Sequence, residues 1–429
     1  MNYKGINFLK KQLFSKRNRV RMRYRYYEMK NGIKDFKIAI PNEFKYVSET
    51  LGWCSKAVDS LADRISFKEF DNDVFNMNDI FNMNNKDILT DSAILGALIA
   101  SCSFIYISQD EDKFPRLQVI DAYDATGIID PITNMMTEGY AVLERDEKYN
   151  ILTDAYFTCE ETVVFDYVGH REIHVPNPAR YCLLVPVIHK PDAKRQFGHS
   201  RISRACIDLQ QGALRTLRRS EVAAEFYSYP QKYILGTDSD AEQMDKIRAS
   251  ISTMLQISRS EDGGGTPTVG QFAQQSMSPH IDQLKSFASL FAGETGLTLD
   301  DLGFVTDNPS SAEAIKAAHE NLRLAARKAQ KNFATSLINV GYLAASVRDE
   351  FEYKRNQIYE TSVKYEPLFE PDMSTLSLIG DGAIKINQAV PGYFNKDNLQ
   401  DLTGIASSKL DVPTVPDDEE SGLEQTHTA

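Results

Sequence analysis

The residues best suited to chemistry in this 429-residue sequence are a few histidines, aspartates and glycines, and they form no complete catalytic set. His170 and His174, in "HREIH", have a spacing that a metal ion can use. The surrounding sequence is rich in strand formers, however, and supplies no evident third ligand. We therefore interpret both histidines as strand residues and expect no metal site.

The other motifs of this kind are also incomplete. "EDGGGTPTVG" lacks the lysine that pairs with phosphates in a Walker loop, so it predicts a flexible turn. Asp121, Asp124 and Asp130 are grouped in sequence, but on a strand and its turn they are interpreted as surface and turn residues. No Ser-His-Asp or Cys-His arrangement has a recognisable context. We expect neither catalysis nor a cofactor.

The cysteines are far apart and include no CxxC pair, which favours free thiols in a reducing compartment over disulfides or a zinc site. We interpret them as small buried residues. They are Cys54, Cys102, Cys159, Cys182 and Cys206.

Composition excludes some classes of protein. With 42% hydrophobic and 25% charged residues, the chain can bury a sizeable core. A formal net charge of -12 argues against binding nucleic acid over the whole surface. No stretch reaches the roughly 18 consecutive apolar residues of a membrane span, so we expect no membrane partner. The basic N-terminus has no apolar region before a small-residue cleavage site, and we expect no signal peptide.

Positive charge is concentrated at the start of the chain. Residues 1–30 hold ten Lys or Arg and one acid, Glu28, for a charge of +9. The arginines alternate with other residues, so they would share one face of a strand but spread around a helix; they are Arg17, Arg19, Arg21, Arg23 and Arg25. Two interpretations stay open: a nucleic-acid-binding arm, or a basic segment that docks on an acidic surface.

The first half of the chain predicts an α+β fold. Residues 43–67 read as an amphipathic helix that runs into a strand, because apolar residues recur at steps of three and four. A second such unit has a helix from about Asp91 and a strand at residues 104–107. Residues 117–187 predict several short strands separated by turns.

Residues 200–226 predict a helix about 40 Å long with Ser200 as its N-cap. Its apolar stripe is poor in bulky side chains, which allows close approach and suits packing against copies of itself. The stripe comprises Ile202, Ala205, Cys206, Leu209, Ala213, Leu217, Ala223 and Ala224. The opposite, polar face carries Arg204, Asp208, Gln211, Arg215, Arg218 and Arg219.

A small module follows, with a strand at residues 230–236, a helix at 240–255 and a strand at 268–273. A second helix begins near residue 277, with Ser278 predicted as its cap and Pro279 at its first position. Its stripe is Ile281, Leu284, Ala288 and Phe291. The module therefore lies between two helices.

After a loop rich in Gly and Asp, Ser310 and Glu313 form a capping box for a helix that runs to about Val347. Residues 353–367 predict a strand, and residues 373–405 predict two short helices. The acidic segment after Asp411 is nearly devoid of hydrophobic residues and predicts disorder.

This order of elements resembles the portal (head–tail connector) proteins of tailed bacteriophages. The resemblance is strongest from "GHSRISRACIDLQQGALRTLRRSEVAAEFYSYPQKYILG" through "DNPSSAEAIKAAHENLRLAARKAQKNF". It implies an elongated α+β subunit of a closed ring. The implied parts are a basic arm (1–42), a wing (43–199), a first stem helix (200–228), a clip (229–276), a second stem helix (277–298), a tunnel loop (299–309), a long helix with a wing strand (310–372), crown-like helices (373–410) and a disordered acidic tail (411–429).

The resemblance also implies a function. Twelve copies would form a ring at one capsid vertex in the virion, assembled in the host cytoplasm, through which double-stranded DNA is packaged and ejected. The implied partners are further copies of the chain, the terminase large subunit, the major capsid or scaffold protein and a head–tail adaptor. The clip would dock terminase and later the adaptor.

Roles for individual residues follow from this picture. Asp300, Asp301 and Asp307 would line the channel and repel phosphates, which lets DNA slide, although turn chemistry explains the same residues. The stem packing would use Ala205, Leu209, Ala213, Leu217, Ala223 and Ala224. The arginines that would meet DNA or a neighbouring copy are Arg204, Arg215, Arg218 and Arg219.

Two functions of other classes remain as alternatives. One is sequence-independent nucleic-acid binding through the basic arm. The other is a nuclease or hydrolase built on the strand-rich segment, for which no base, nucleophile or ligand set is visible.

Overall fold

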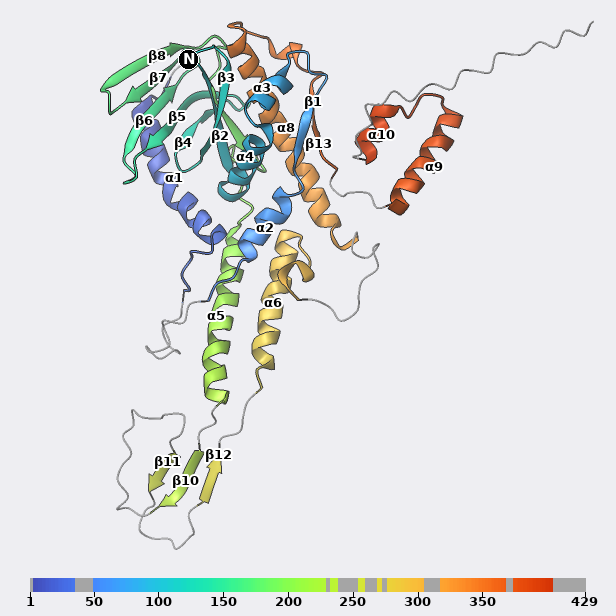
Figure 1. Cartoon of the computed structure of the whole chain (residues 1–429). Helices are drawn as coiled ribbons and strands as arrows, with labels where there is room; N and C mark the ends of the chain where they lie inside the picture. The colour runs from blue at the N-terminus through green and yellow to red at the C-terminus, as the bar shows by residue number, and fades with distance from the viewer. Residues whose placement is uncertain are drawn as a thin grey trace, which may run out of the picture. The chain divides into compact units, whose positions relative to one another are not determined.

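The computed structural model describes residues 3–34, 49–228, 232–237, 254–258, 268–271, 276–304, 317–367 and 373–403. The chain divides into two compact units, Met1–Tyr365 and Glu366–Ala429, which are described separately below. Figure 1 shows their helices and strands, which confirm the predicted mixture of both.

The basic N-terminal segment forms helix α1 (Ile6–Tyr27) and not a strand. Its buried side chains recur at helical spacing, so one side of the helix is apolar; they are Leu9, Leu13, Val20 and Tyr26. The first two share a core cluster with Tyr140 and Val142 of the adjacent sheet. The segment is therefore an integral part of the first unit.

Strands dominate residues 102–188, as the sequence predicts, in two antiparallel sheets of order β3-β2-β9 and β4-β5-β6-β7-β8. Phe104 of the central strand β2 lies opposite Ile120 on one side and Pro186 on the other. The strands are β2 (Cys102–Gln109), β3 (Pro115–Asp121), β4 (Ala125–Ile129), β5 (Met136–Arg145), β6 (Ile151–Phe157), β7 (Glu161–Asp166), β8 (Arg171–Pro176) and β9 (Leu184–Ile188).

Both predicted helix–strand units are present. Helix α2 (Trp53–Ala62) precedes strand β1 (Phe67–Asp71), and helix α4 (Lys86–Ala100) precedes β2. Residues 43–48 of the first predicted helix lie outside the described residues. Helix α4 begins five residues before the predicted Asp91, directly after Asn85, whose φ of 53° interrupts the helical backbone.

The short helix α3 (Met77–Met83) was not predicted from the sequence. Its start is marked by Asp73, whose carboxylate accepts hydrogen bonds from the backbone N–H groups of Met77 at 2.9 Å and Asn78 at 2.8 Å. A carboxylate that receives these N–H groups is a typical helix-start signal.

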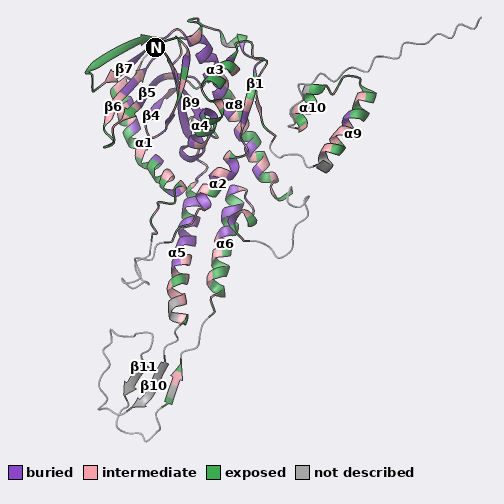
Figure 2. Ribbon diagram, viewed as in Figure 1, coloured by how far each residue is buried: buried purple, intermediate pink, exposed green. Residues whose placement is uncertain are grey.

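Helix α8 (Glu320–Arg348) packs against β9, β2 and β3 and ends one residue beyond the predicted Val347. Its C-terminal half is purple along most of its length in Figure 2, because this half lies in the core. The capping box Ser310 and Glu313 lies outside the described residues. The strand predicted at 353–367 is mostly wrong: only β13 (Ser362–Tyr365) is extended, after the short 3-10 helix η3 (Arg355–Gln357), and β13 pairs antiparallel with β1.

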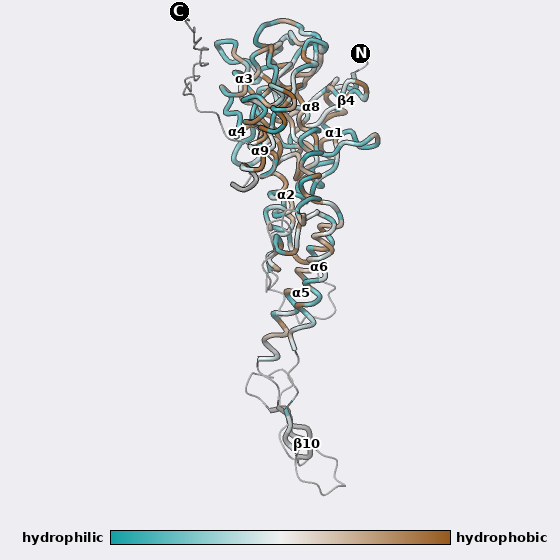
Figure 3. Tube along the Cα trace, turned by 90° about the vertical axis from the view of Figure 1, so that its right-hand side faces the viewer, coloured by the Kyte–Doolittle hydropathy of each residue, from teal (hydrophilic) through white to brown (hydrophobic). Residues whose placement is uncertain are grey.

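Helices α5 (Arg204–Ser228) and α6 (Ser278–Thr295) are the two predicted stem helices, here called the stem pair. Figure 3 traces both with alternating polar and hydrophobic segments, while brown hydrophobic stretches are frequent among the elements around α4 and α8. Between the two helices in sequence, β10 (Lys232–Thr237) pairs in parallel with β11 (Met254–Ser258) and antiparallel with β12 (Thr268–Gln271).

Both predicted caps of the stem pair are wrong. Helix α5 starts at Arg204, and the hydroxyl of Ser200 instead donates to the carbonyl of Ile99 at 2.5 Å. Ser203 takes the capping position, since its hydroxyl accepts from the N–H of Cys206 at 3.2 Å. Ser278 is the first residue of α6 and makes no cap.

The predicted helix at 240–255 is wrong at its end, because Met254 and Leu255 belong to β11. Its residues 240–253 lie outside the described residues.

The second unit contains the two predicted short helices, α9 (Met373–Ala389) and α10 (Lys396–Thr403). The side chain of Asn387 holds their connection: its Nδ2 donates to the carbonyl of Phe394 at 2.8 Å, and its Oδ1 accepts from the N–H of Phe394 at 2.7 Å. The predicted acidic tail, 411–429, lies outside the described residues.

All five cysteines are buried free thiols, which confirms their interpretation as small core residues. Within the described ranges, no helix combines the length and the apolar character needed to cross a bilayer.

Candidate interface of the stem pair

The stem pair is antiparallel, with a register fixed by contacts along its length. The hydroxyl of Ser203, the residue that caps α5, lies 2.9 Å from Oε1 of Glu294 on α6, and the hydroxyl of Thr216 on α5 lies 3.1 Å from Oε1 of Gln283. Residue numbers rise along α5 as they fall along α6, so the helices run in opposite directions side by side, as Figure 1 shows.

Gly212 is a position where the two helices approach each other closely. A Cβ atom there would lie 2.8 Å from both Cε1 and Cζ of Phe287, a distance that real Cβ atoms do not show. The sequence predicted close approach along α5 but assigned it to alanines and to other copies. Within the chain, the close contact is instead made by a glycine against a phenylalanine of α6.

The residues predicted to pack the stem differ in burial. Ala213 is buried inside the chain, and Ala205 is exposed. The remaining members of the set are half-buried: Leu209, Leu217, Ala223 and Ala224. The contacts within the chain therefore use only part of the predicted stripe, and the other part stays open on the surface of α5.

Helix α6 also leaves apolar surface open. Ala288 and Phe291 of its predicted stripe are buried, whereas Ile281 is 58% exposed. Leu290, outside that stripe, is 61% exposed. Ile281 and Leu290 are nine positions apart, so they lie on opposite faces of the helix.

The predicted polar face of α5 is wrong at two positions, because Gln211 and Arg218 are buried. Arg215 donates from Nη1 to the carbonyl of Lys34 at 3.3 Å. Arg204 is exposed, with its Nε 3.8 Å from a carboxylate oxygen of Asp208, and Arg219 is half-buried. A contact of these arginines with DNA or with another copy stays a prediction.

Gln210 and Gln211, which were not predicted to have a role in the site, tie α5 to the segments around α1 and α2. The amide of Gln210 donates to the carbonyl of Leu51 at 2.7 Å and accepts from the N–H of Cys54 at 2.9 Å. Gln211 donates to the hydroxyl of Tyr26 at 2.9 Å and accepts from the N–H of Lys34 at 2.8 Å. The sequence offered one signal for these contacts, two adjacent glutamines within a helix of small residues. Amide side chains that become buried need hydrogen-bond partners.

Two of the three predicted loop acids can be placed. Asp301 accepts hydrogen bonds at 2.9 Å from both the N–H and the hydroxyl of Thr298, next to the 3-10 helix η2 (Asp300–Leu302). These bonds support the turn interpretation for Asp301. Asp300 is exposed. Asp307 lies outside the described residues.

Much of the charge on α1 is used inside the chain. Arg17 pairs with Asp124 at 3.2 Å, and Lys10 pairs with the buried Asp154 at 3.1 Å. Arg23 donates to the carbonyl of Ala100 at 2.6 Å. These contacts support the interpretation of a basic segment docked on an acidic surface, and that surface belongs to the same chain.

The histidines and aspartates considered for chemistry are not brought together. His174 lies on the exposed strand β8, 2.9 Å from Glu161, and hydrogen bonding to Glu161 raises the histidine pKa. Asp124 pairs with Arg145, and Asp121 accepts from the hydroxyl of Tyr24 at 2.9 Å. In the described part of the chain, no group of three or more His, Cys, Asp or Glu residues could hold a metal ion.

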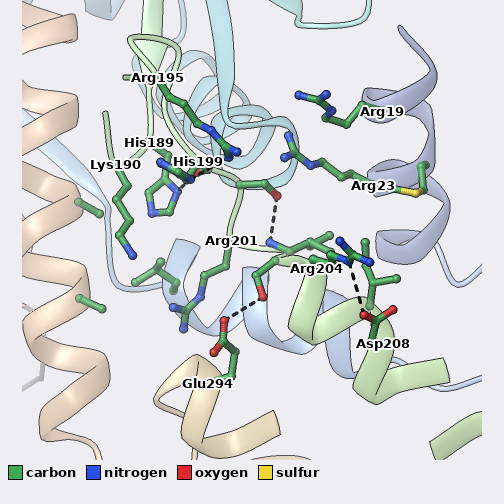
Figure 4. Close-up of a pocket in the computed structure, with 18 of the residues that line it drawn as sticks. Arg19, Arg23, His189, Lys190, Arg195, His199, Arg201, Arg204, Asp208 and Glu294 are labelled. Atoms are coloured by element: carbon green, nitrogen blue, oxygen red, sulfur yellow. Dashed lines mark hydrogen bonds and ion pairs between the residues drawn. The ribbon is translucent and has the colours of Figure 1, made fainter. Parts of the chain in front are cut away.

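A cavity of about 900 Å³ lies between α1, residues 189–204, α6 and α8, and Figure 4 shows arginines from several elements that line it. Its lining holds two carboxylates, from Asp208 and Glu294, against a larger set of cations. We call it the basic cavity, after its eight cationic residues: Arg19, Arg23, Lys34, Lys190, Arg195, Arg201, Arg204 and Lys328.

Arg201 secures the entry to the stem pair beside this cavity. Its guanidinium donates to the carbonyl of Ala57 on α2 at 3.2 Å and to the carbonyl of Thr295 on α6. Burial lowers the arginine pKa. The residues just before α5 are thus tied to both neighbouring helices.

The model of the family described as "Phage portal protein, SPP1 Gp6-like" matches residues 6–375, most of the chain. The chain belongs to this portal family. The match includes α1, both sheets, the stem pair and α8.

Curated relatives carry the same description. The chain is 24% identical over 316 residues to a "Portal protein" of Mycobacterium phage L5 and to one of Mycobacterium phage D29. In each comparison the alignment spans 69% of this chain and 65% of the relative. The chain thus spans about 65% of the length of these portal relatives.

Solved structures with a similar backbone trace include a chain of the "Virion of native gene transfer agent (GTA) particle". The TM-score is 0.43 and the sequence identity 12%, and the match covers 83% of this chain and 90% of that chain. A chain of the "Neck of empty GTA particle computed with C6 symmetry" has a TM-score of 0.42 and 13% identity over the same shares. The portal family assignment does not depend on these structures.

Proposed function

We propose that this chain is the subunit of a closed ring, expected to contain twelve copies, that forms the portal channel for phage DNA. One observation carries the proposal: in a chain of the portal family, the contacts within the stem pair leave large apolar side chains exposed. Ile281 and Leu290 of α6 are both more than half exposed. In a ring, each copy presents a different surface to each of its two neighbours, so both sides of the pair have a partner.

The channel role is supported by charge. Asp300 is an exposed acid in the segment proposed as the tunnel loop. Copies of an acidic residue around a channel repel DNA phosphates and add no counterion-release affinity, so the polymer can slide. Asp301 and Asp307 are proposed to add to this lining, although the bonds of Asp301 to Thr298 give it a structural role as well.

The remaining assignments follow from the proposed ring. The clip, residues 229–276, would dock the terminase large subunit and later a head–tail adaptor, and the wing would contact the capsid or scaffold protein. The ring would assemble in the host cytoplasm and remain in the virion. Its role would be structural and not catalytic.

Negative-stain microscopy and native mass spectrometry of the purified chain test the proposal, with rings around a central hole as the expected result. Ile281→Lys with Leu290→Lys should abolish the rings, since each substitution places charge where α6 exposes an apolar side chain, on two opposite faces of the helix. Ile132→Lys is the matched control, because Ile132 is even more exposed but lies in the turn between β4 and β5. A wild-type chain that stays monomeric at micromolar concentration across a range of salts would overturn the proposal.

Nucleic-acid binding through α1 is a second candidate, favoured by the exposed side chains of Lys11, Arg19 and Arg25. Deleting residues 1–30 is a poor test, because Leu9 and Leu13 belong to the core. Changing the three exposed cations to Gln leaves the core intact. Loss of duplex binding together with a shallower salt dependence would support this function, and unchanged binding would exclude it.

A further inference from the structure

The basic cavity concentrates positive charge that the described part of the chain does not neutralise. Arg204 is the one of its eight Lys and Arg residues that forms an ion pair there, a long contact with Asp208. In the same ranges, the other cations around the opening form no ion pair with a carboxylate; among them are Arg19, Arg23, Lys190, Arg195 and Lys328.

These cations also act on one another. The pKa of Arg23 is lowered to about 10, first by burial and then by the nearby charges of Arg19 and Arg195. Like charges held together disfavour their own charged forms, and an anion that enters between them relieves this repulsion. In a chain with a net charge of -12, such a concentration of cations indicates a binding site for anionic groups.

The lining of the basic cavity is not only charged. Met22, Leu61, Ile202 and Ile207 contribute apolar surface between the cations. The phosphates of a nucleic acid have no apolar group to place against these side chains, whereas a protein surface can offer carboxylates and large apolar side chains together. The lining therefore favours a protein partner over nucleic acid.

A surface of matching character lies elsewhere on the same unit. We call it the acidic ridge; it comprises Asp59 and Asp63 at α2 and Asp87 and Asp91 on α4. The pKa of Asp91 is raised, first by burial and then by the charges of Asp87 and Asp63, so these carboxylates lie close enough to repel one another. The described residues provide no cation paired with Asp63, Asp87 or Asp91.

Apolar side chains accompany the acidic ridge, as the basic cavity requires. Ile88, next to Asp87 on α4, is 74% exposed, and Met83 just before α4 is 60% exposed. Exposed apolar side chains with charged neighbours are typical of a surface that docks on another protein.

Helix α2 places the two surfaces back to back. Leu61 lines the basic cavity, and Asp59 and Asp63 lie two residues before and after it. At 3.6 residues per turn, two residues correspond to a rotation of about 200°, so both aspartates point away from the cavity. A subunit with complementary surfaces on opposite faces can join the next copy in the same orientation, which is the geometry of a ring.

We propose that the basic cavity of each copy receives the acidic ridge of the neighbouring copy. This inference rests on the proposed ring and specifies which surfaces meet. Ile88 would enter the apolar part of the cavity, while Asp87 and Asp91 would pair with the cations at its rim.

A charge swap tests the contact in the full-length chain. Arg19→Glu with Lys328→Glu reverses the charge at two exposed positions of the cavity, and Asp87→Lys with Asp91→Lys reverses it at two positions of the ridge. Each pair of substitutions should weaken ring assembly at least about tenfold, as measured by native mass spectrometry, because like charges would then face each other. The chain that carries all four substitutions should form rings again, because the charges are complementary once more.

The matched control is Lys11→Glu with Arg327→Glu, which makes the same change in net charge on the same two helices outside the cavity lining. Circular dichroism of every variant establishes that it is folded. A wild-type chain without rings would overturn the proposed ring and this inference together. Rings in the wild type and in both reversed variants would overturn the inference alone.

Two further outcomes decide against the inference. If the fourfold variant stays folded but unassembled, the two surfaces do not face each other. If the cavity variant assembles normally but loses affinity for a 30-base-pair duplex, the cavity binds nucleic acid and not the ridge.

Discussion

Helices α8 and α6 are both long, but they differ in how much of their surface the rest of the chain buries. Along α8, the C-terminal half is buried on nearly all sides, with Phe333, Leu337 and Val340 inaccessible to solvent. Along α6, burial is confined to a few residues near one end, and Ile281 and Leu290 remain exposed. Figure 2 shows this contrast between the purple helix and the largely green one.

The contrast separates two tasks. The elements around α8 obtain their packing from the chain itself, so they are expected to fold without a partner. The stem pair obtains only part of its packing from the chain, through contacts such as Gly212 against Phe287. The open remainder is where another copy is proposed to contribute.

The largest expected effect on stability comes from removing a large side chain of α8 from the core. Phe333→Ala should lower the free energy of unfolding by about 3–5 kcal/mol, because it leaves a cavity in fully packed surroundings. Leu290→Ala on α6 should change it by less than about 0.5 kcal/mol in the unassembled chain, because the side chain is exposed. Urea unfolding at low protein concentration measures both. Similar losses at the two sites would contradict the contrast.

The second effect is a pH dependence of the free energy of unfolding, which arises from His189, a residue next to α8. Burial lowers the pKa of His189, which stacks on Phe333, to about 4. The folded state thus holds the neutral ring, and the contribution to stability is fully present above about pH 6.5 and is lost as the pH falls toward 4. The loss should reach about 3 kcal/mol.

The His189→Gln variant should lack this part of the pH dependence in urea unfolding between pH 7 and 4. The control is His280→Gln on α6, which should retain the wild-type slope. An identical slope in wild type and His189→Gln would show that the imidazole does not titrate in this way.

The smallest effect concerns the stem pair and its close approach. Gly212→Leu should lower the free energy of unfolding by about 1–3 kcal/mol, because the new side chain crowds Phe287. Adding Phe287→Ala should recover part of this loss. The control is Gly293→Ala in α6, where a Cβ atom meets open space. It should raise the free energy of unfolding by about 0.5–1 kcal/mol, because alanine has the higher helix propensity. Thermal unfolding compares the three variants. If Gly212→Leu were neutral, the helices would not be in close contact.

The sequence predicted many elements because their signals are local. Helical spacing of apolar residues predicted α2, α5 and α6, and short runs of strand formers between turns predicted several of the strands between β3 and β9. The predicted positions of the helix ends were less accurate. Ser200 and Ser278 have the residue type of a cap, but the first bends back to the carbonyl of Ile99 and the second begins the helix itself.

The candidate interface was predictable in outline but not in detail. Small residues on α5 predicted close contact, yet periodicity placed Gln211 and Arg218 on the exposed face, although they are buried. Their environment depends on α1 and α2, which lie far away in the sequence. The proposed pairing of a basic cavity with an acidic ridge had no sequence signal at all, because its residues come from several separate elements.

The sequence by itself determined the order and type of the main elements, the free cysteines and the resemblance to portal proteins, since each depends on residues close together in the chain. Only the tertiary structure decided that the basic N-terminal helix is docked on the adjacent sheet, that Gly212 meets Phe287, and that cations gather opposite acids across α2. The physical reason is that charge pairing and close packing depend on distance in space, which the spacing of residues along the chain does not specify.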